Sequence, residues 1–244
     1  MKTNTDLKND ALEALRGNWG KAVLATLLYL LLALAVVSPM EYTAIKQQSY
    51  MTEQIGGYSN SIASAASLIQ DPEYQTLQKQ NVTMSILGFL LEVFILFPVA
   101  VGFTNAFRKL LVNQDTEMVR NTFDLSNYFH KVLGMLQMTV LIALWTLLLF
   151  IPGIIKALAY AMTPFILEEN PELSTTEAIH HSRMLMKGHK FDLFWLYLSF
   201  IGWMLLGLLT LGIGYLWLAP YMQTAIASFY REVKEEYEVK GGLD

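Results

Sequence analysis

Hydrophobic positions along this chain fall into long charge-free blocks separated by short polar segments. The longest block runs from Leu193 to Tyr230, 38 residues without Asp, Glu, Lys, Arg or His. At about 1.5 Å per residue, a single helix of this length would far exceed the roughly 30 Å of a bilayer core. Gly212 and Gly214 interrupt the block near its middle. The pattern therefore predicts two membrane-spanning helices joined by a tight turn.

The same reasoning predicts an all-α polytopic membrane protein with about six transmembrane helices in a single domain over residues 1–244. The fourth span is the shortest, since its 14 residues reach only about 21 Å, and a re-entrant segment is the alternative there. Pro98 is expected to kink the second span, and Pro152-Gly153 to end the third. The predicted spans are residues 22–40, 82–107, 132–151, 154–167, 193–210 and 213–230.

Positive charge predicts the orientation, because Lys and Arg concentrate on the cytoplasmic side of membrane proteins. With six spans and a cytoplasmic N-terminus, 14 of the 17 Lys and Arg residues lie inside, and Lys46, Lys79 and Lys156 lie on or near the outside. If residues 154–167 do not cross, the division becomes 8 inside and 9 outside. The count favours six spans with both termini in the cytoplasm.

The pattern of the segment before the first span predicts an amphipathic helix that lies along the cytoplasmic interface. A cleaved signal peptide is the alternative, because Ala33-Leu34-Ala35 resembles a cleavage site. The acidic residues upstream, such as Asp6 and Asp10, argue against it. The apolar face of the helix is expected to comprise Leu7, Ala11, Leu12, Leu15 and Trp19.

Two polar segments interrupt the apolar blocks. Residues 41–81 are expected to form an extracytoplasmic loop with a short helix over Ile62–Ile69. The loop is either a partly ordered surface segment or a cap that binds a protein partner. Residues 174–188 are expected to form a cytoplasmic helix, opened by the capping box Ser174-x-x-Glu177 and ended by Gly188.

Composition agrees with a membrane protein: 54% of residues are hydrophobic and 16% are charged, against a soluble average of about 25% charged. The net charge of −4 is small and comes from mixed loops, so no nucleic-acid partner is expected. The chain has no cysteine, which excludes disulfides, thiol nucleophiles and thiolate metal sites.

Three residues are candidates for binding: Glu92, Lys156 and Tyr160. Glu92 lies near the middle of the second span, where a charged carboxylate is costly unless it is paired. It is either a functional site or a protonated glutamic acid hydrogen-bonded inside the bundle. Lys156 is either an anchor that reaches the outer interface or a partner for Glu92.

Small residues recur every four positions in the fourth span, at Gly153, Ala157 and Ala161. This spacing places them on one helix face, where another backbone can approach closely. The stripe is expected to serve packing within the bundle, and homodimerisation is the alternative.

The segment after the fourth span holds three of the four histidines. Glu177 with His180, His181 and His189 contains possible zinc or iron ligands. A solvated polar helix face explains these residues more simply, so neither a metal nor a cofactor is expected. No nucleophile turn, phosphate loop or His-Glu-x-x-His motif is present, and a non-enzymatic protein is expected.

Several short motifs resemble a bacterial integral-membrane family known as domain of unknown function 975. In the C-terminal half the motifs are Ile151-Pro152-Gly153-Ile154-Ile155, Tyr160-Ala161-Met162, Ser182-Arg183-x-x-Met186-Lys187-Gly188, Ser199-Phe200-Ile201-Gly202-Trp203, Pro220-Tyr221 and Phe229-Tyr230. Leu15 to Trp19 and Pro98-x-x-x-Gly102 are also similar, whereas the 41–81 loop departs from the family. The resemblance implies a protein of the bacterial cytoplasmic membrane with no catalytic residues to transfer.

These observations lead to one functional hypothesis and two alternatives. The chain is expected to be a scaffold or accessory protein of the bacterial inner membrane that acts through contacts with membrane lipids or proteins. The alternative is a small transporter or lipid-handling protein that uses Glu92 in a cavity between kinked helices. A membrane enzyme with a metal centre at Glu177 and the three histidines is a further alternative.

Overall fold

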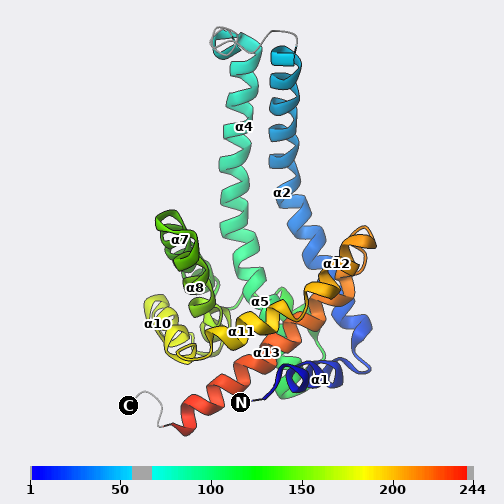
Figure 1. Cartoon of the computed structure of the whole chain (residues 1–244), viewed down its shortest axis with the longest axis vertical. Helices are drawn as coiled ribbons and strands as arrows, with labels where there is room; N and C mark the ends of the chain where they lie inside the picture. Colours follow the sequence, from blue (N-terminus) through cyan, green and yellow to red (C-terminus); the bar gives the residue numbers. More distant parts are fainter. Residues whose placement is uncertain (1, 57–67, 241–244) are drawn as a thin grey trace. The chain divides into compact units, whose positions relative to one another are not determined.

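The computed structural model describes residues 2–56 and 68–240, and these residues form helices without any strand (Figure 1). The predicted all-α class is therefore confirmed. Within the described ranges, five segments are long and apolar enough to cross a membrane, and they correspond to the first five predicted spans. The five are Trp19–Gln54, Pro72–Asn113, Tyr128–Leu148, Phe150–Glu169 and Lys190–Leu209. The count of six and the side of the termini stay predictions.

Contacts divide the chain into two compact units, Leu30–Leu96 and a larger unit made of Met1–Tyr29 and Phe97–Asp244. The smaller unit contains most of α2 (Trp19–Gly56), all of α4 (Pro72–Leu91) and the π-helical turn η1 (Glu92–Leu96). Asp71 caps α4 by accepting hydrogen bonds from the backbone N–H groups of Glu73 and Tyr74.

Within this smaller unit, α2 and α4 pack against each other. Gly88 lies so close to Met40 that an added Cβ would overlap the thioether, and the side chains of Gln47 and Asn81 share a hydrogen bond. Helix therefore occupies residues 41–56 and 72–81 of the segment expected to be a loop. Most of the short helix expected over 62–69 lies outside the described residues.

The larger unit holds the remaining helices. They are α1 (Asn4–Leu15), α5 (Phe97–Asn113), α6 (Met118–Thr122), α7 (Tyr128–Leu148), α8 (Phe150–Tyr160), α9 (Thr163–Glu169), α10 (Thr175–Leu185), α11 (Lys190–Leu198), α12 (Ile201–Leu209) and α13 (Tyr215–Val239). The predicted sixth span falls in α13, which is not among the five long apolar segments.

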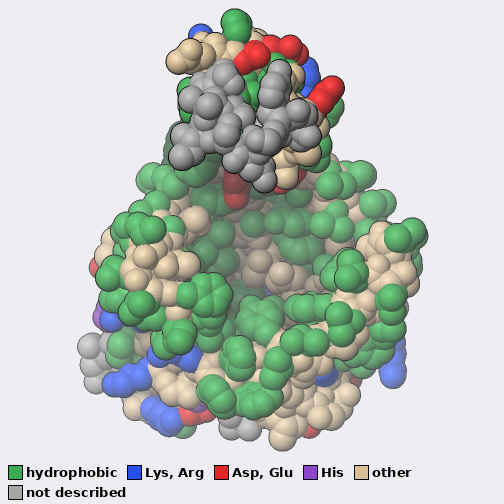
Figure 2. Space-filling view, turned by 45° about the horizontal axis from the view of Figure 1, so that its top comes forward, with side chains coloured by type: hydrophobic (Ala, Val, Ile, Leu, Met, Phe, Trp, Pro, Cys, Tyr) green, Lys and Arg blue, Asp and Glu red, His purple; other side chains and the backbone are tan. Residues whose placement is uncertain are grey.

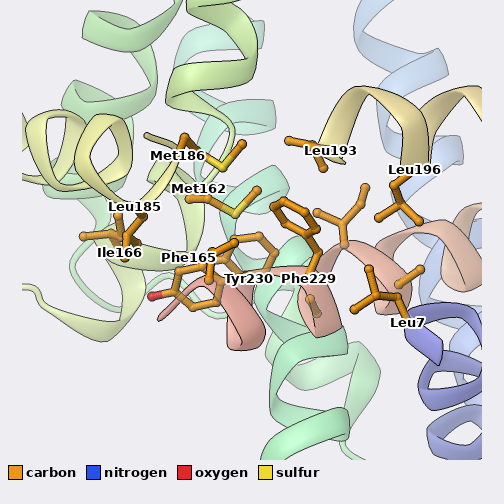
Figure 3. Close-up of a cluster of buried hydrophobic side chains, with 14 of the residues drawn as sticks. Leu7, Met162, Phe165, Ile166, Leu185, Met186, Leu193, Leu196, Phe229 and Tyr230 are labelled. Carbon is orange, nitrogen blue, oxygen red and sulfur yellow. The ribbon is translucent and has the colours of Figure 1, made fainter. Parts of the chain in front are cut away.

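The main core of the larger unit lies where α1, α9, α10, α11 and α13 converge (Figure 3). The rings of Phe165 and Tyr230 stack there with centroids 4.6 Å apart, and Phe229 is fully buried. Leu7 and Ala11 of α1 reach into the same cluster. The apolar face of α1 therefore packs mainly against the protein itself, and Leu12 is its exposed member, at 44%.

Two helix breaks shape the region around α8. The chain turns at Leu149, which has extended dihedrals (φ −157°, ψ 136°), so α7 ends before Pro152 and not at Pro152-Gly153 as expected. Pro152 instead occupies the first turn of α8, where a missing N–H removes no helical hydrogen bond. The second break, between α8 and α9, is bridged by Ser182 of α10. Its Oγ donates to Ala159 O (2.9 Å) and accepts from Met162 N (3.2 Å).

The predicted capping box of α10 is present. Ser174 accepts a hydrogen bond from Glu177 N, and the Glu177 carboxylate accepts one from Ser174 N. Ala178, Ser182 and Leu185 are buried, but the helix ends at Leu185, before Gly188, where the sequence predicted its end. Gly188 has a left-handed φ of +94° and lies in the turn that leads to α11.

Candidate functional site

The most concentrated group of buried charges surrounds Glu168 and Glu169, the last two residues of α9. Lys131 of α7, whose side chain has no exposed surface, lies 2.7 Å from Glu168 Oε2. Lys109 of α5 lies 2.8 Å from Glu168 Oε1 and also 3.8 Å from Asp124. Lys131 additionally donates to the backbone carbonyl of Asp124 at 2.9 Å. One carboxylate therefore joins α5, α7 and α9.

Glu169 extends the network toward α13. Arg108 lies 2.7 Å from Glu169 Oε1, and Lys234 lies 2.8 Å from Glu169 Oε2. The Tyr230 hydroxyl donates to the same Oε2 at 2.5 Å. Asn105 holds the arginine by accepting from its Nε at 2.8 Å and also donates to Pro164 O at 2.9 Å. The carboxylates are surrounded by cations and hydrogen-bond donors. This arrangement is better suited to holding α5, α7, α9 and α13 together than to acid–base chemistry.

This network is not predicted by the sequence pattern. In that pattern Arg108, Lys109 and Lys131 are only three of the 14 cations expected on the cytoplasmic side. The detectable signal was Glu168-Glu169 directly after an apolar segment, at the membrane face where those cations were placed. Buried cations of this kind need partners, so the acidic pair could have been matched to them.

A second network fastens α1 to α13. Asp10 Oδ2 accepts from Lys2 Nζ (2.8 Å), Ser228 Oγ (2.7 Å) and Arg231 (2.8 Å). Burial raises the pKa of Asp10, but the hydrogen bonds from Lys2 and Ser228 and the two positive charges outweigh burial and hold the pKa below its ordinary value. Asp10 and Arg231 also line an open polar cleft of about 550 Å³.

The predicted binding residues do not form one cluster within either unit. Glu92 is exposed and begins the π-helical turn η1 of the smaller unit. Lys156 belongs to the larger unit, where its ammonium lies 4.4 Å from the ring centroid of Trp145. Tyr160 is buried beside Ala159 and Ile179. A role for any of them in binding stays a prediction, as does pairing between Glu92 and Lys156.

The three small residues of the predicted packing stripe differ in burial. Gly153 is buried, and a Cβ added there would lie 2.8 Å from Thr146 Cα. The missing side chain lets α7 and α8 approach closely near their turn. Ala157 and Ala161 are only half-buried.

The candidate metal residues point to different surroundings. His180 is exposed on α10 and His181 lines a cleft with Tyr230 and Tyr237. His189 lies 3.4 Å from Asp192 and 3.5 Å from Glu236. Across residues 2–56 and 68–240, no group of three or more His, Asp or Glu residues has an arrangement suited to a metal ion.

An apolar cleft of about 400 Å³ was also not expected from the sequence. Three tryptophans, Trp19, Trp203 and Trp217, line it together with Leu12 of α1 and Thr210 and Gly214 from the α12–α13 turn. These residues lie far apart in the chain, and only the folded arrangement brings them together.

One of the motifs that resemble the family has a clear structural reason. Gly102, in Pro98-x-x-x-Gly102, lies against the end of α6, and an added Cβ would overlap Thr122 O and lie 2.8 Å from Asn121 O. Backbone cannot yield as a flexible side chain can, so this position requires glycine for the approach of α5 and α6.

No curated protein and no protein of solved structure matches this chain. Residues 1–237 match the family described as Protein of unknown function (DUF975), and this range is nearly the whole chain. The resemblance noted from the motifs is therefore confirmed, and the chain belongs to the DUF975 family.

Proposed function

We propose that this protein is a non-enzymatic accessory or scaffold protein of the bacterial cytoplasmic membrane, which acts through contacts with lipids and membrane proteins. The observation that carries the proposal is that buried charged side chains join helices, whereas many apolar side chains face outward. The Glu168–Glu169 network uses its charges to join helices, and its members are largely buried. Breaking a buried, paired charge from one side is costly, so we assign these groups a structural role.

The outward-facing side chains support the same proposal. In the α7–α8 turn, Leu147, Leu149 and Ile151 are 85%, 65% and 70% exposed. Hydrophobic side chains make up much of the surface in Figure 2. Apolar patches of this extent mark surfaces that contact a membrane or another protein. A protein partner at residues 41–81 remains part of the proposal.

Purification in a mild detergent followed by native mass spectrometry tests this function. We expect stoichiometric phospholipid or a co-purifying membrane protein to remain bound, and to be lost after exchange into a harsher detergent. The variant Glu92→Gln is examined in the same way and should leave the bound species unchanged, because this proposal gives Glu92 no role in binding. A preparation that is free of lipid and protein under the mildest conditions would contradict the proposal.

A second candidate, transport through a site at Glu92, is favoured by one observation. Glu92 is the first residue of a π-helical turn, and π turns occur frequently at functional sites. Glu92→Gln keeps the shape of the side chain and removes its charge. Transport by this variant is expected to become independent of pH. A pH-sensitive dye inside proteoliposomes follows the movement of protons. If wild type and Glu92→Gln move no protons or exchange them equally, the transport candidate fails.

A further inference from the structure

Side chains from α1, α12 and α13 form the tryptophan-lined cleft of the larger unit. Trp203 and Leu206 of α12 and Trp217 of α13 line it, and Leu12 of α1 and Trp19 contribute from the N-terminal part of the chain. Its volume of about 400 Å³ falls within the roughly 300–1,000 Å³ of sites that bind small molecules. The cleft is therefore large enough to hold part of a ligand.

Two glycines bring α12 and the start of α13 close together at this cleft. A Cβ added at Gly207 would lie 3.1 Å from Tyr215 Cε2, and one added at Gly214 would lie 3.0 Å from Gly207 Cα. The Tyr215 hydroxyl also donates to Met204 O at 3.0 Å. These contacts fix the spacing between the two helices that line the cleft.

The lining of the cleft offers little hydrogen bonding to a ligand that lies along it. Among the described lining residues none is charged. Thr210 Oγ1 already donates to Gly207 O (2.8 Å) and accepts from Gly214 N (2.9 Å). A peptide would bring backbone N–H and C=O groups that need partners, whereas a hydrocarbon chain brings none. The lining is therefore suited to an aliphatic chain.

The tryptophans add hydrogen-bond donors to this apolar lining. Trp203 and Trp217 are 55% and 50% exposed. Within the described residues, the indole N–H groups of Trp19, Trp203 and Trp217 have no hydrogen-bond partner in the protein. Indoles are enriched where hydrocarbon meets lipid headgroups, because the ring is apolar and its N–H is polar. These side chains can therefore contact both an acyl chain and the ester oxygens next to it.

A cation lies beside the cleft. Lys8 is one helical turn from Leu12 on α1, so the two side chains share a face of the helix. The Lys8 ammonium lies 4.3 Å from the ring centroid of Phe200. Phe200 in turn makes a T-shaped contact with Tyr221, which lines the cleft, with ring centroids 5.2 Å apart. One aromatic ring therefore separates the ammonium from the cleft.

Lys8 has a hydrogen bond but no counter-ion. Its Nζ donates to Ser199 O at 3.0 Å, and it forms no ion pair with a carboxylate of the described residues. Partial burial lowers the pKa of Lys8, with no acidic neighbour to oppose the effect. Two acids of α1 are engaged elsewhere, since Asp10 binds Arg231 and Glu13 lines the polar cleft. An anionic group beside Lys8 would supply the missing negative charge.

We propose that the tryptophan-lined cleft binds one anionic phospholipid of the surrounding membrane, with an acyl chain along the apolar lining and the phosphate beside Lys8. The proposal rests on the proposed function, because it assigns a site to the lipid contact that this function requires. The lining accepts the chain without leaving a polar group unsatisfied. The ammonium favours a headgroup with net negative charge over a zwitterionic one.

Native mass spectrometry with defined lipids tests the role of the charge. Delipidated protein in mild detergent is offered equal amounts of phosphatidylglycerol and phosphatidylcholine with the same acyl chains. We expect one phosphatidylglycerol per chain to be retained in preference. Lys8→Gln should weaken that preference about fivefold, the effect of one lysine near an anionic surface, whereas Lys8→Arg should preserve it. Equal retention of the two lipids by the wild type would overturn the proposal.

The matched control for the charge is Lys46→Gln, which removes an exposed lysine from α2 in the smaller unit. We expect this variant to keep the preference of the wild type. A loss of preference as large as that in Lys8→Gln would show that total charge, and not a site at Lys8, selects the lipid.

A pair of neighbouring variants tests the cleft itself. Leu206 lines the cleft and Leu205 does not, although the two are similarly exposed, at 53% and 58%. Leu206→Trp should occupy part of the cleft and lose the bound phosphatidylglycerol, whereas Leu205→Trp should retain it. The same retention in both variants, whether full or lost, would overturn the proposal.

Brominated acyl chains test the cleft without adding bulk to it, because bromine quenches the fluorescence of indoles that it contacts. The chain has five tryptophans. We expect one equivalent of brominated phosphatidylglycerol to quench the wild type. The variant with both Trp203→Phe and Trp217→Phe should lose most of this quenching, and the variant with both Trp145→Phe and Trp195→Phe should keep it. Equal quenching in the two double variants would place the chain elsewhere.

The outcomes separate this site from the proposed function. If protein purified in mild detergent without added lipid carries neither lipid nor a protein partner, the proposed function fails. If it carries either one, and Lys8→Gln and Leu206→Trp retain phosphatidylglycerol as the wild type does, only the site fails.

Discussion

Lys131 Nζ lies 2.7 Å from Glu168 Oε2, and the lysine side chain has no exposed surface. Replacing the lysine with Met would leave a largely buried carboxylate with Lys109 as its remaining cation. Breaking a buried ion pair from one side costs about 3–5 kcal/mol. We therefore expect Lys131→Met to lower the thermal unfolding temperature in detergent substantially, as measured by circular dichroism.

The matched control for this variant is Lys187→Met, which removes the same charge from an exposed position. We expect it to leave the unfolding temperature nearly unchanged. Equal unfolding temperatures for Lys131→Met and wild type would show that the network contributes little to stability.

Gly102→Ala should destabilise the protein by about 1–3 kcal/mol, the usual cost of adding volume to a packed site. The new Cβ would meet the backbone carbonyls of Asn121 and Thr122, so α6 must move. Chemical denaturation in micelles measures the change. Gly20→Ala is the control, because a Cβ there meets no heavy atom within 4 Å. The explanation fails if the two variants unfold at the same denaturant concentration.

Ser182→Ala removes both hydrogen bonds that bridge the α8–α9 break. Met162 N and Ala159 O lose this buried partner, and an unsatisfied buried group costs about 1–3 kcal/mol. Hydrogen exchange should become faster at residues 159–163 than elsewhere. The control Ser49→Ala, at an exposed site in α2, should leave exchange there unchanged. Uniform exchange across the chain in Ser182→Ala would argue against a local bridge.

Acidification should release α1 from α13. The pKa of Asp10 is lower in the folded protein than its ordinary value, so its contribution to stability is present above about pH 4 and is lost as the pH falls through the folded-state value. Amide exchange of residues 4–15, corrected for intrinsic rates, should rise below about pH 4. Asp10→Asn should show the faster exchange already at neutral pH. Protection of α1 that is identical at pH 7 and pH 3 would disprove this role.

The sequence predicted those features that depend on local pattern. Charge-free blocks located five long apolar helical segments, and Ser174-x-x-Glu177 located the start of α10. These signals are contained in neighbouring residues, because hydrophobic length and capping are local properties.

Features that depend on residues distant in the chain could not be predicted in this way. The partners of Glu169 include Arg108 and Lys234, and no local pattern relates them. Hydropathy likewise identified residues 193–210 as long enough to cross. It cannot predict that Lys8 donates a hydrogen bond to Ser199 O in the middle of this segment. The helix breaks at Leu149 and Ser199 were likewise not predicted from the local sequence pattern.

Neighbouring positions on an α-helix point about 100° apart, so Glu168 and Glu169 can serve different sets of cations only while α9 keeps one rotational phase. Helix α9 has only seven residues, from Thr163 to Glu169. Inserting or deleting a single residue there would rotate both carboxylates away from their partners together. The number of residues in this short helix should therefore tolerate change less than the identity of most side chains it carries.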